Sequence, residues 1–177
     1  MRKSNKRNLL ITGLMGAGKS TVGRLVALEL QREFIDTDEY LEKHYGPASD
    51  LLIQPNGDML FQEVEMKIAT ELASRESLVI STGGRFMMNQ ANIDVMTEHC
   101  HIICLEAEIK DLITRLLSAD PTTFRPRFDA ASDKTQLMQS LQRQSKPYYK
   151  QFESLKTSGL LPEEVAIRVT KWFLRQS

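Results

Sequence analysis

The sequence predicts an α/β protein of one domain in which the strands of the sheet run parallel. Short apolar runs that end at turn residues alternate along the chain with longer segments of helical spacing. This alternation is typical of βαβ units, which place helices in layers against a parallel sheet. A chain of 177 residues is long enough to bury a core but has little room for a second domain, so we expect a single domain over 1–177.

The expected strands are short runs of four or five residues. Asn-Leu-Leu-Ile-Thr at 8–12 is closed by Gly13, as expected for a strand that is buried on both faces. Three later short runs also read as strands, and we expect these at 33–36, 77–81 and 101–105.

Helices are expected between and after these strands. The segment 19–30 carries apolar residues at helical spacing, and 38–45 reads as a short helix that Gly46-Pro47 ends. We expect further helices at 59–75, 108–117, 134–145 and 163–174, with a turn at 147–149. The segment 118–133 is polar and lacks a period, so we expect a mobile loop there.

Composition and charge exclude several classes of partner. Lys and Arg number 23 and Asp and Glu also number 23, so the net charge is zero and no basic face indicates nucleic acid. No stretch approaches the roughly 20 apolar residues that span a bilayer. Two cysteines are too few for a disulfide scaffold, so we expect a reduced, cytoplasmic setting. The basic residues at 1–7 are expected to form a flexible tail.

A phosphate-binding motif follows the first expected strand. Residues 13–20 fit the pattern G-x-x-x-x-G-K-[ST] in full, and they lie between a strand and a helix as this motif requires. Its glycines let backbone N–H groups turn toward phosphate oxygens, and the helix N-terminus adds partial positive charge. Lys19 supplies a full charge for the β- and γ-phosphates, and the Ser20 hydroxyl is a magnesium ligand. The residues expected to bind ATP here are Gly13, Met15, Gly16, Ala17, Gly18, Lys19, Ser20 and Thr21.

Two carboxylates stand at the end of the second expected strand, in the sequence Asp36-Thr37-Asp38. A carboxylate at this edge of the sheet can orient the magnesium shell, and another can accept the proton of an attacking hydroxyl. The Asp-x-Asp pattern alone is weak evidence, because Asp38 is equally suited to be the N-cap of the helix that follows.

Taken together, these motifs resemble the shikimate kinase family. The matching residues are 13–24, 34–38, 81–84 and 125–126. The resemblance covers about 8–149 and implies a P-loop fold in three α/β/α layers with a five-stranded parallel sheet. It also implies a substrate-binding helical segment over about 38–66 and a lid over about 118–133. Members of the family use ATP to phosphorylate the 3-hydroxyl of shikimate in aromatic amino-acid biosynthesis.

For the reacting centre, the resemblance implies a magnesium ion and a small set of catalytic groups. Asp36 would belong to the magnesium shell together with Ser20, and Asp38 would contact the hydroxyls of the substrate. The implied catalytic residues are Lys19, Asp38 and Arg125. An arginine that meets the transferring phosphates suits phosphoryl transfer, which depends mainly on positioning and charge stabilisation.

For the two substrates, the resemblance assigns residues on both sides of the expected site. Arg115 matches an arginine near the adenine, and Arg125 matches the arginine of the lid. Gly83 and Gly84 would approach the acceptor through their backbone. The residues expected to bind the acceptor are Asp38, Gln62, Gly83, Gly84 and Arg85.

The acceptor side of the sequence departs from the family pattern. Gln62 stands where the family has a carboxylate-binding arginine, and Ser145 stands where it has a second one. Loss of one arginine from a buried charge pair costs about 2–5 kcal/mol, or roughly 30-fold to several-thousand-fold in affinity. Arg85, in place of a third glycine, either replaces this cation beside Glu65 or points to solvent. A positive φ there would cost an arginine about 1–2 kcal/mol.

The residues therefore leave three functions open. The first is phosphorylation of shikimate by ATP with Mg²⁺, with Arg85 or an arginine of the lid as a substitute for the missing cations. The second is a kinase for another polyhydroxylated metabolite, and the third is a nucleotide-binding protein without turnover. The intact nucleotide side argues against the third. We expect a monomer that has no nucleic acid or membrane as a partner.

Overall fold

The computed structural model describes residues 7–120 and 125–176 of the chain. The expected N-terminal tail lies outside these residues except for Arg7. Part of the expected lid, 121–124, also lies outside them.

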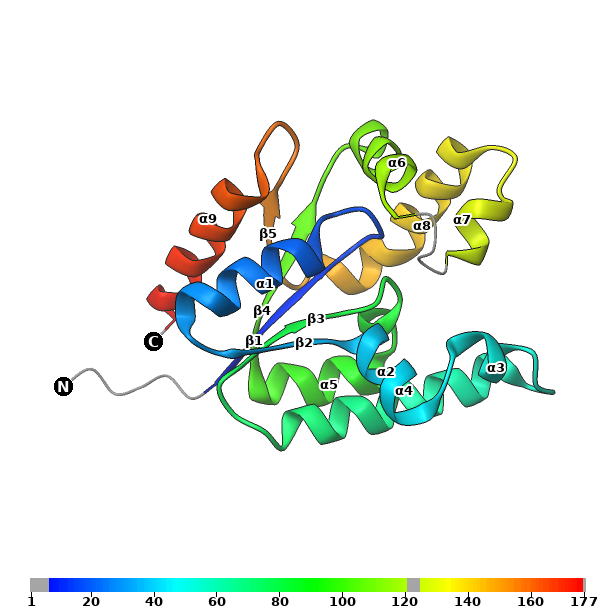
Figure 1. The fold of residues 1–177 in the computed structure, drawn as a ribbon, viewed down its shortest axis with the longest axis horizontal. Helices are drawn as coiled ribbons and strands as arrows, with labels where there is room; N and C mark the ends of the chain where they lie inside the picture. The colour runs from blue at the N-terminus through cyan, green and yellow to red at the C-terminus, as the bar shows by residue number, and fades with distance from the viewer. Residues whose placement is uncertain (1–6, 121–124, 177) are drawn as a thin grey trace.

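The core of the molecule is a parallel sheet of five strands in the part of the chain that the structure describes. The strands are β1 (Asn8–Gly13), β2 (Glu33–Asp36), β3 (Leu78–Ser81), β4 (Cys100–Glu106) and β5 (Glu153–Lys156). They lie side by side in the order β2-β3-β1-β4-β5, as Figure 1 shows. The prediction of a five-stranded parallel sheet is confirmed, and the first four strands lie within about one residue of their expected bounds.

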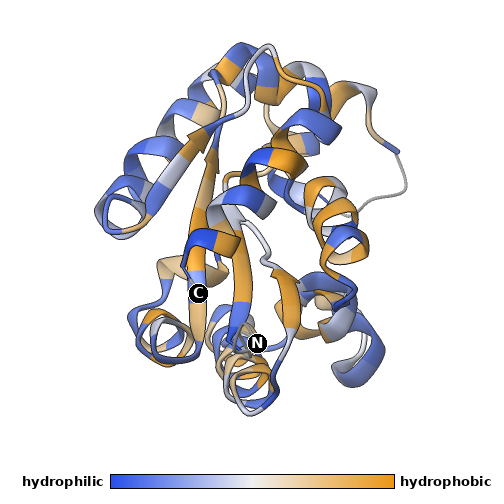
Figure 2. Ribbon diagram, turned by 90° about the vertical axis from the view of Figure 1, so that its left-hand side faces the viewer, coloured by the Kyte–Doolittle hydropathy of each residue, from blue (hydrophilic) through white to orange (hydrophobic). Residues whose placement is uncertain are grey.

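Helices cover both faces of the sheet because its side chains alternate between the faces. The helices that do so are α1 (Lys19–Leu30), α4 (Gly57–Ala73), α5 (Gln90–His99), α6 (Ile109–Ser118), α8 (Lys134–Tyr149) and α9 (Pro162–Arg175). On β1, Leu9 and Ile11 pack in the cluster formed with α1 and α9, whereas Leu10 packs in the cluster formed with α4 and α5. Figure 2 shows apolar strands between helices whose outward faces are hydrophilic. The expected three-layer α/β/α arrangement is therefore confirmed.

A helical segment follows β2 at the carboxyl end of the sheet. It consists of α2 (Thr37–Tyr45) and α3 (Ala48–Leu52), which lead into α4. Both α2 and α3 contact α4. The sequence pattern predicted α2 and α4 but missed α3, which has only 5 residues and buries none of them completely.

The second half of the chain corrects two expectations. The predicted turn at 147–149 is wrong, because α8 continues through Pro147 to Tyr149. Proline in a helix costs about 3 kcal/mol, but Tyr149 is buried and the partly buried Tyr148 packs against the same core cluster, and this packing holds the last turn. The expected aperiodic loop also contains a short helix, α7 (Pro126–Ala130), because Phe128 is only 1% exposed and anchors it in the core.

None of the described helices is long and apolar enough to cross a membrane.

Candidate active site

A cavity of about 680 Å³ lies at the carboxyl ends of the central strands. The strand order brings the loops after β1, β2 and β3 together there, as is usual for ligand sites in open parallel sheets. Of the residues predicted to bind ATP, those from Met15 to Thr21 and Arg115 line this cavity. Asp36, Asp38 and Arg125 line it as well.

Gly13 is not among the residues that line the cavity. It has a φ of 141°, and a Cβ atom there would lie 2.3 Å from the backbone oxygen of Leu105. A glycine is therefore required at this position, because β1 and β4 approach closely just before the phosphate loop, which we define as residues 14–18 between β1 and α1.

Lys19 lies at the first position of α1, directly after the phosphate loop. Its Nζ donates a hydrogen bond to the carbonyl oxygen of Leu14 over 3.0 Å, which folds the side chain back across the loop. The residue is only 8% exposed, and this burial lowers the pKa of its ammonium group. The negative charges of Asp38 and Asp36 oppose that shift. The arrangement places one cation, with few partners of its own, at the expected position of the phosphates.

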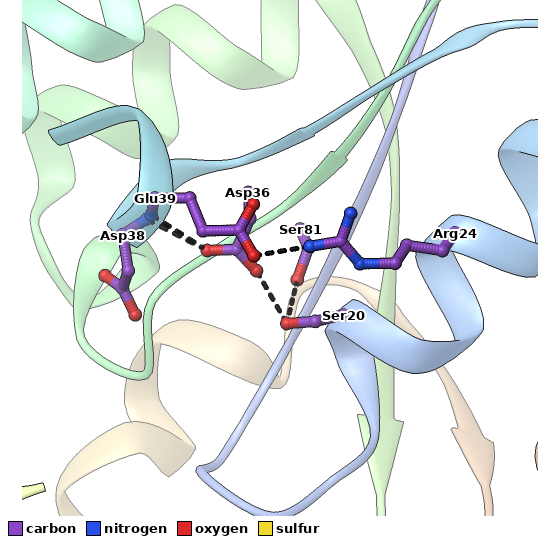
Figure 3. A network of polar contacts seen from close by, with 6 residues as sticks. All are labelled: Ser20, Arg24, Asp36, Asp38, Glu39 and Ser81. Carbon is purple, nitrogen blue, oxygen red and sulfur yellow. Dashed lines mark hydrogen bonds and ion pairs between the residues drawn. The ribbon is translucent and has the colours of Figure 1, made fainter. Parts of the chain in front are cut away.

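Asp36 joins the phosphate loop to the start of α2. Its Oδ2 accepts a hydrogen bond of 2.6 Å from the Ser20 hydroxyl, which also lies 3.3 Å from the Ser81 hydroxyl. Its Oδ1 accepts from the backbone N–H groups of Asp38 and Glu39, at 3.0 and 3.5 Å. Figure 3 shows Asp36 between Ser20 and the first turn of α2. The N-cap of α2 is therefore Asp36, so the alternative interpretation of Asp38 as the N-cap is wrong.

Asp38 lies beside the glycine loop that follows β3. A Cβ atom on Gly83 would lie 2.3 Å from Oδ1 of Asp38, so only glycine leaves room for this carboxylate. The Gly83 N–H donates to the Thr37 hydroxyl over 2.8 Å, which fixes the loop against the start of α2. Partial removal from solvent raises the pKa of Asp38 to about 6, and the charge of Asp36 adds to this effect. Near neutral pH the carboxylate is thus poised to accept a proton.

Two arginines line the cavity at the end where the sequence predicts the nucleotide. Arg115 donates to the hydroxyl and the backbone oxygen of Thr157, each at 3.0 Å, and approaches the carbonyl of Gly16 at 3.4 Å. Arg125 donates to the carbonyls of Leu116 and Asp120 at 2.8 and 3.0 Å. Thr157 could not be found from the sequence. It directly follows β5, and the exposed, polar sequence of β5 does not show the apolar pattern of a strand.

The expected acceptor residues are only partly brought together. Gly83 and Gly84 line the cavity, whereas Gln62 and Arg85 do not, and both side chains are exposed. Arg85 has a φ of −117°, so the arginine is not strained by a positive φ. Ser145 is 3% exposed, and its hydroxyl donates to the carbonyl of Gln142 in its own helix.

Glu65 is a buried carboxyl on α4 at the acceptor side of the site. It is 5% exposed and makes no hydrogen bond or ion pair with another described residue. Burial raises the pKa of Glu65 to about 8, and the charge of Asp38 adds to the shift, whereas Arg85 opposes it. Arg85 is therefore close enough for its charge to oppose the rise in the pKa of Glu65, although the two side chains form no ion pair.

Tyr149 connects α8 to the glycine loop. Its hydroxyl donates to the carbonyl oxygen of Gly84 over 3.0 Å. Burial raises the pKa of Tyr149 to about 12, so the hydroxyl keeps its proton and remains a donor at neutral pH. The sequence reasoning placed Tyr149 in a turn and missed this contact, because only the tertiary packing of α8 reveals it.

Comparisons with known proteins agree on one family. A family model described as shikimate kinase matches residues 15–173. The chain belongs to the shikimate kinase family. It is 32% identical to the shikimate kinase of Caldicellulosiruptor bescii over 164 residues, which cover 92% of this chain and 93% of that protein. It is 31% identical to the shikimate kinase of Thermodesulfovibrio yellowstonii over 171 residues, which cover 97% of each chain.

A solved structure of the family resembles the chain over nearly its whole length. The shikimate kinase from Acinetobacter baumannii, in complex with shikimate, superimposes with a TM-score of 0.86 at 25% identity. The match covers 97% of this chain and 95% of that chain. The resemblance seen in the sequence motifs is therefore confirmed at the level of the family.

Proposed function

We propose that the protein transfers the γ-phosphoryl group of ATP to a hydroxyl of a small metabolite, with shikimate as the first candidate acceptor and shikimate 3-phosphate as the product. The observation that carries this proposal is the single cavity in which Lys19, the Ser20–Asp36 pair and Asp38 meet beside the glycine loop. One end of the cavity suits the phosphates of a nucleotide, and the other presents a carboxylate to an acceptor hydroxyl.

Magnesium fits the donors at this site. Ser20 and Asp36 offer hard oxygen ligands only 2.6 Å apart, and the described residues contain no group of three or more His, Cys, Asp or Glu that would form an all-protein metal cage. Mg²⁺ bound with a nucleotide needs only one or two protein ligands, since phosphates and water supply the others. When bound, the ion would neutralise charge on the β- and γ-phosphates.

The other roles in the reaction fall to side chains of the protein. Lys19 binds the phosphates as they separate, and Asp38 accepts the proton of the attacking hydroxyl. Arg115 bridges α6, Thr157 and the phosphate loop, where it borders the base of the nucleotide. Arg125 supplies a second cation to the transferring group.

A second acceptor class is favoured by one observation. Gln62 and Ser145 stand where the family has carboxylate-binding arginines, and the buried Glu65 has no cation paired with it. An acceptor without a carboxylate, such as an uncharged polyol, would need no cation there and would avoid repulsion by the charge of Asp38. A nucleotide-binding protein without turnover is the third possibility.

One assay separates these functions. ATP consumption is measured with Mg²⁺ and either shikimate, a panel of uncharged polyols and sugar acids, or no acceptor. Shikimate-dependent ADP release at a kcat on the order of 1 s⁻¹ or more supports the proposal. Turnover of a polyol alone would assign the second function. Nucleotide binding without turnover of any acceptor would assign the third.

Arg85→Gly tests the carboxylate contact on the acceptor side. We expect the KM for shikimate to rise about tenfold or more, because a guanidinium binds a carboxylate through two hydrogen bonds that a glycine lacks. Arg168→Ala, which removes an exposed arginine of α9, is the control. If Arg85→Gly uses shikimate as well as the wild type does, Arg85 has no part in acceptor binding.

Gly83→Ala tests the position of Asp38. The new methyl group would lie 2.3 Å from Oδ1 of Asp38, so the carboxylate must turn away while the fold is kept. We expect kcat to fall about 10- to 100-fold, because displacement of a reacting group by about 1 Å has effects of this size. Gly84→Ala is the matched control, since the nearest atom to its Cβ is 3.7 Å away. Equal kcat values for the two variants would contradict the placement of Asp38.

We also propose that the protein acts as a monomer in the cytoplasm. No acidic or basic excess in the sequence points to a charged partner. Light scattering after size-exclusion chromatography measures the first point directly, and a dimer at micromolar concentration would contradict it.

A further inference from the structure

A second cavity, of about 650 Å³, lies on the other side of the phosphate loop. It is lined by residues of α6, α8 and the carboxyl ends of β4 and β5, elements that lie in the upper half of Figure 1. The two cavities have no lining residue in common, because Leu14 faces this one and Met15 faces the nucleotide cavity. The phosphate loop is therefore the wall between them.

The mouth of this second cavity is rich in cations. The positively charged residues that line it are Arg143, Lys146, Lys150 and Lys156. None of these side chains makes a hydrogen bond or ion pair with another described residue. The acidic residues on the rim are Glu106 and Glu108, and Glu108 is already paired with Lys110 at 2.9 Å. The unpaired charge at the mouth is thus mainly positive.

The floor of the cavity is apolar. It is formed by the buried side chains of Leu105 and Leu112, with Leu14 and Ala107 beside them. The nearby hydroxyl of Ser145 already donates its proton to the carbonyl of Gln142 within α8, so this proton is not offered to an anion. An apolar floor below a positive mouth suits a molecule that has an apolar body and an anionic group.

Two lining residues connect this cavity to the active site. The carbonyl of Leu14 accepts the Lys19 Nζ at 3.0 Å and the Ala17 N–H at 3.1 Å, so it helps to shape the phosphate loop. The hydroxyl of Tyr149 donates to the carbonyl of Gly84 on the acceptor side. A molecule that packs on Leu14 and Tyr149 would therefore act on both the phosphate loop and the glycine loop after β3.

We propose that this cavity binds a small organic anion with an apolar ring, such as an aromatic phosphate monoester or carboxylate, and that its occupation changes the affinity of the phosphate loop for nucleotide. The cations of α8 and Lys156 bind the anionic group, and the ring packs on Leu105 and Leu112. This proposal is independent of which acceptor the protein phosphorylates.

The binding experiment uses phenyl phosphate as the probe. It is titrated by calorimetry into the full chain saturated with Mg²⁺ and a non-hydrolysable ATP analogue, which blocks the phosphate loop. We expect one site per chain, about tenfold weaker binding to the double variant Lys146→Glu/Lys150→Glu, and no change in Lys171→Glu, which reverses an exposed charge on α9. Benzyl alcohol, which has the ring without the charge, is expected to bind at least about tenfold more weakly than phenyl phosphate.

The outcomes distinguish this site from the active site. No binding, equal binding to both charge variants, or equal binding of benzyl alcohol would overturn the proposal. Displacement of phenyl phosphate by shikimate would also overturn it, because the probe would then occupy the acceptor site. A reciprocal titration of the ATP analogue, with and without phenyl phosphate, tests the coupling, and identical nucleotide affinities would overturn the link through Leu14.

Discussion

Lys19→Ala should lower kcat/KM for ATP by about 10²- to 10³-fold, the size of effect that follows removal of a group that stabilises developing charge. Lys19 is 8% exposed, and among the described residues its ammonium group has one hydrogen-bond partner, the carbonyl of Leu14. Its burial lowers the pKa of the ammonium group, because the cation is removed from water, and a bound anion would offset this loss of solvation. The phosphates of the nucleotide would supply that charge.

The measurement combines steady-state kinetics with calorimetry of ATP binding. Lys43→Ala, which removes an exposed lysine from α2, is the matched control and should behave like the wild type. Thermal unfolding of each variant separates a loss of charge from a loss of fold. Unchanged ATP affinity and turnover in a folded Lys19→Ala protein would contradict the assignment of this loop.

The arrangement of the phosphate loop was predictable because it is local in the sequence. A strand, a glycine loop and a helix that are contiguous in sequence form the phosphate site, so the spacing from Gly13 to Ser20 already determines their relative positions. Asp36 was also predictable, because the carboxyl ends of neighbouring parallel strands meet at one edge of the sheet. Its additional use as the N-cap of α2 required the backbone geometry.

The remaining parts depend on contacts between distant residues. β5 has an exposed, polar sequence, so neither the strand nor Thr157 beyond it had a signal in the hydrophobic pattern. Pro147 argued for a turn, but the burial of Tyr149 against the sheet outweighs the local preference of proline. The acceptor side was the least predictable, because Glu65 and Arg85 come from different elements.

Arg125 is the second residue for which we expect a large effect. It lines the nucleotide cavity, and its guanidinium donates to the carbonyls of Leu116 and Asp120. Its Nε is buried and has no hydrogen-bond partner in the structure. No carboxylate neutralises its charge in an ion pair among the described residues. Hydrogen bonds to phosphate oxygens are charge-assisted and stronger than hydrogen bonds to neutral carbonyls. Arg125 would therefore bind the phosphates of a nucleotide more strongly than it binds these two carbonyls.

Arg125→Ala should therefore lower kcat by about 10³-fold while the Kd for ATP changes less than about fivefold, because the contact strengthens as charge moves in the transition state. Single-turnover kinetics and nucleotide calorimetry measure the two quantities separately. Arg127→Ala is the matched control: it removes an equal charge from an exposed arginine only two residues later, in α7, and should retain nearly full kcat. An equal loss in both variants would indicate a general effect of charge at α7. A weakened Kd with an unchanged kcat would show that Arg125 binds the ground state and does not stabilise the transferring group.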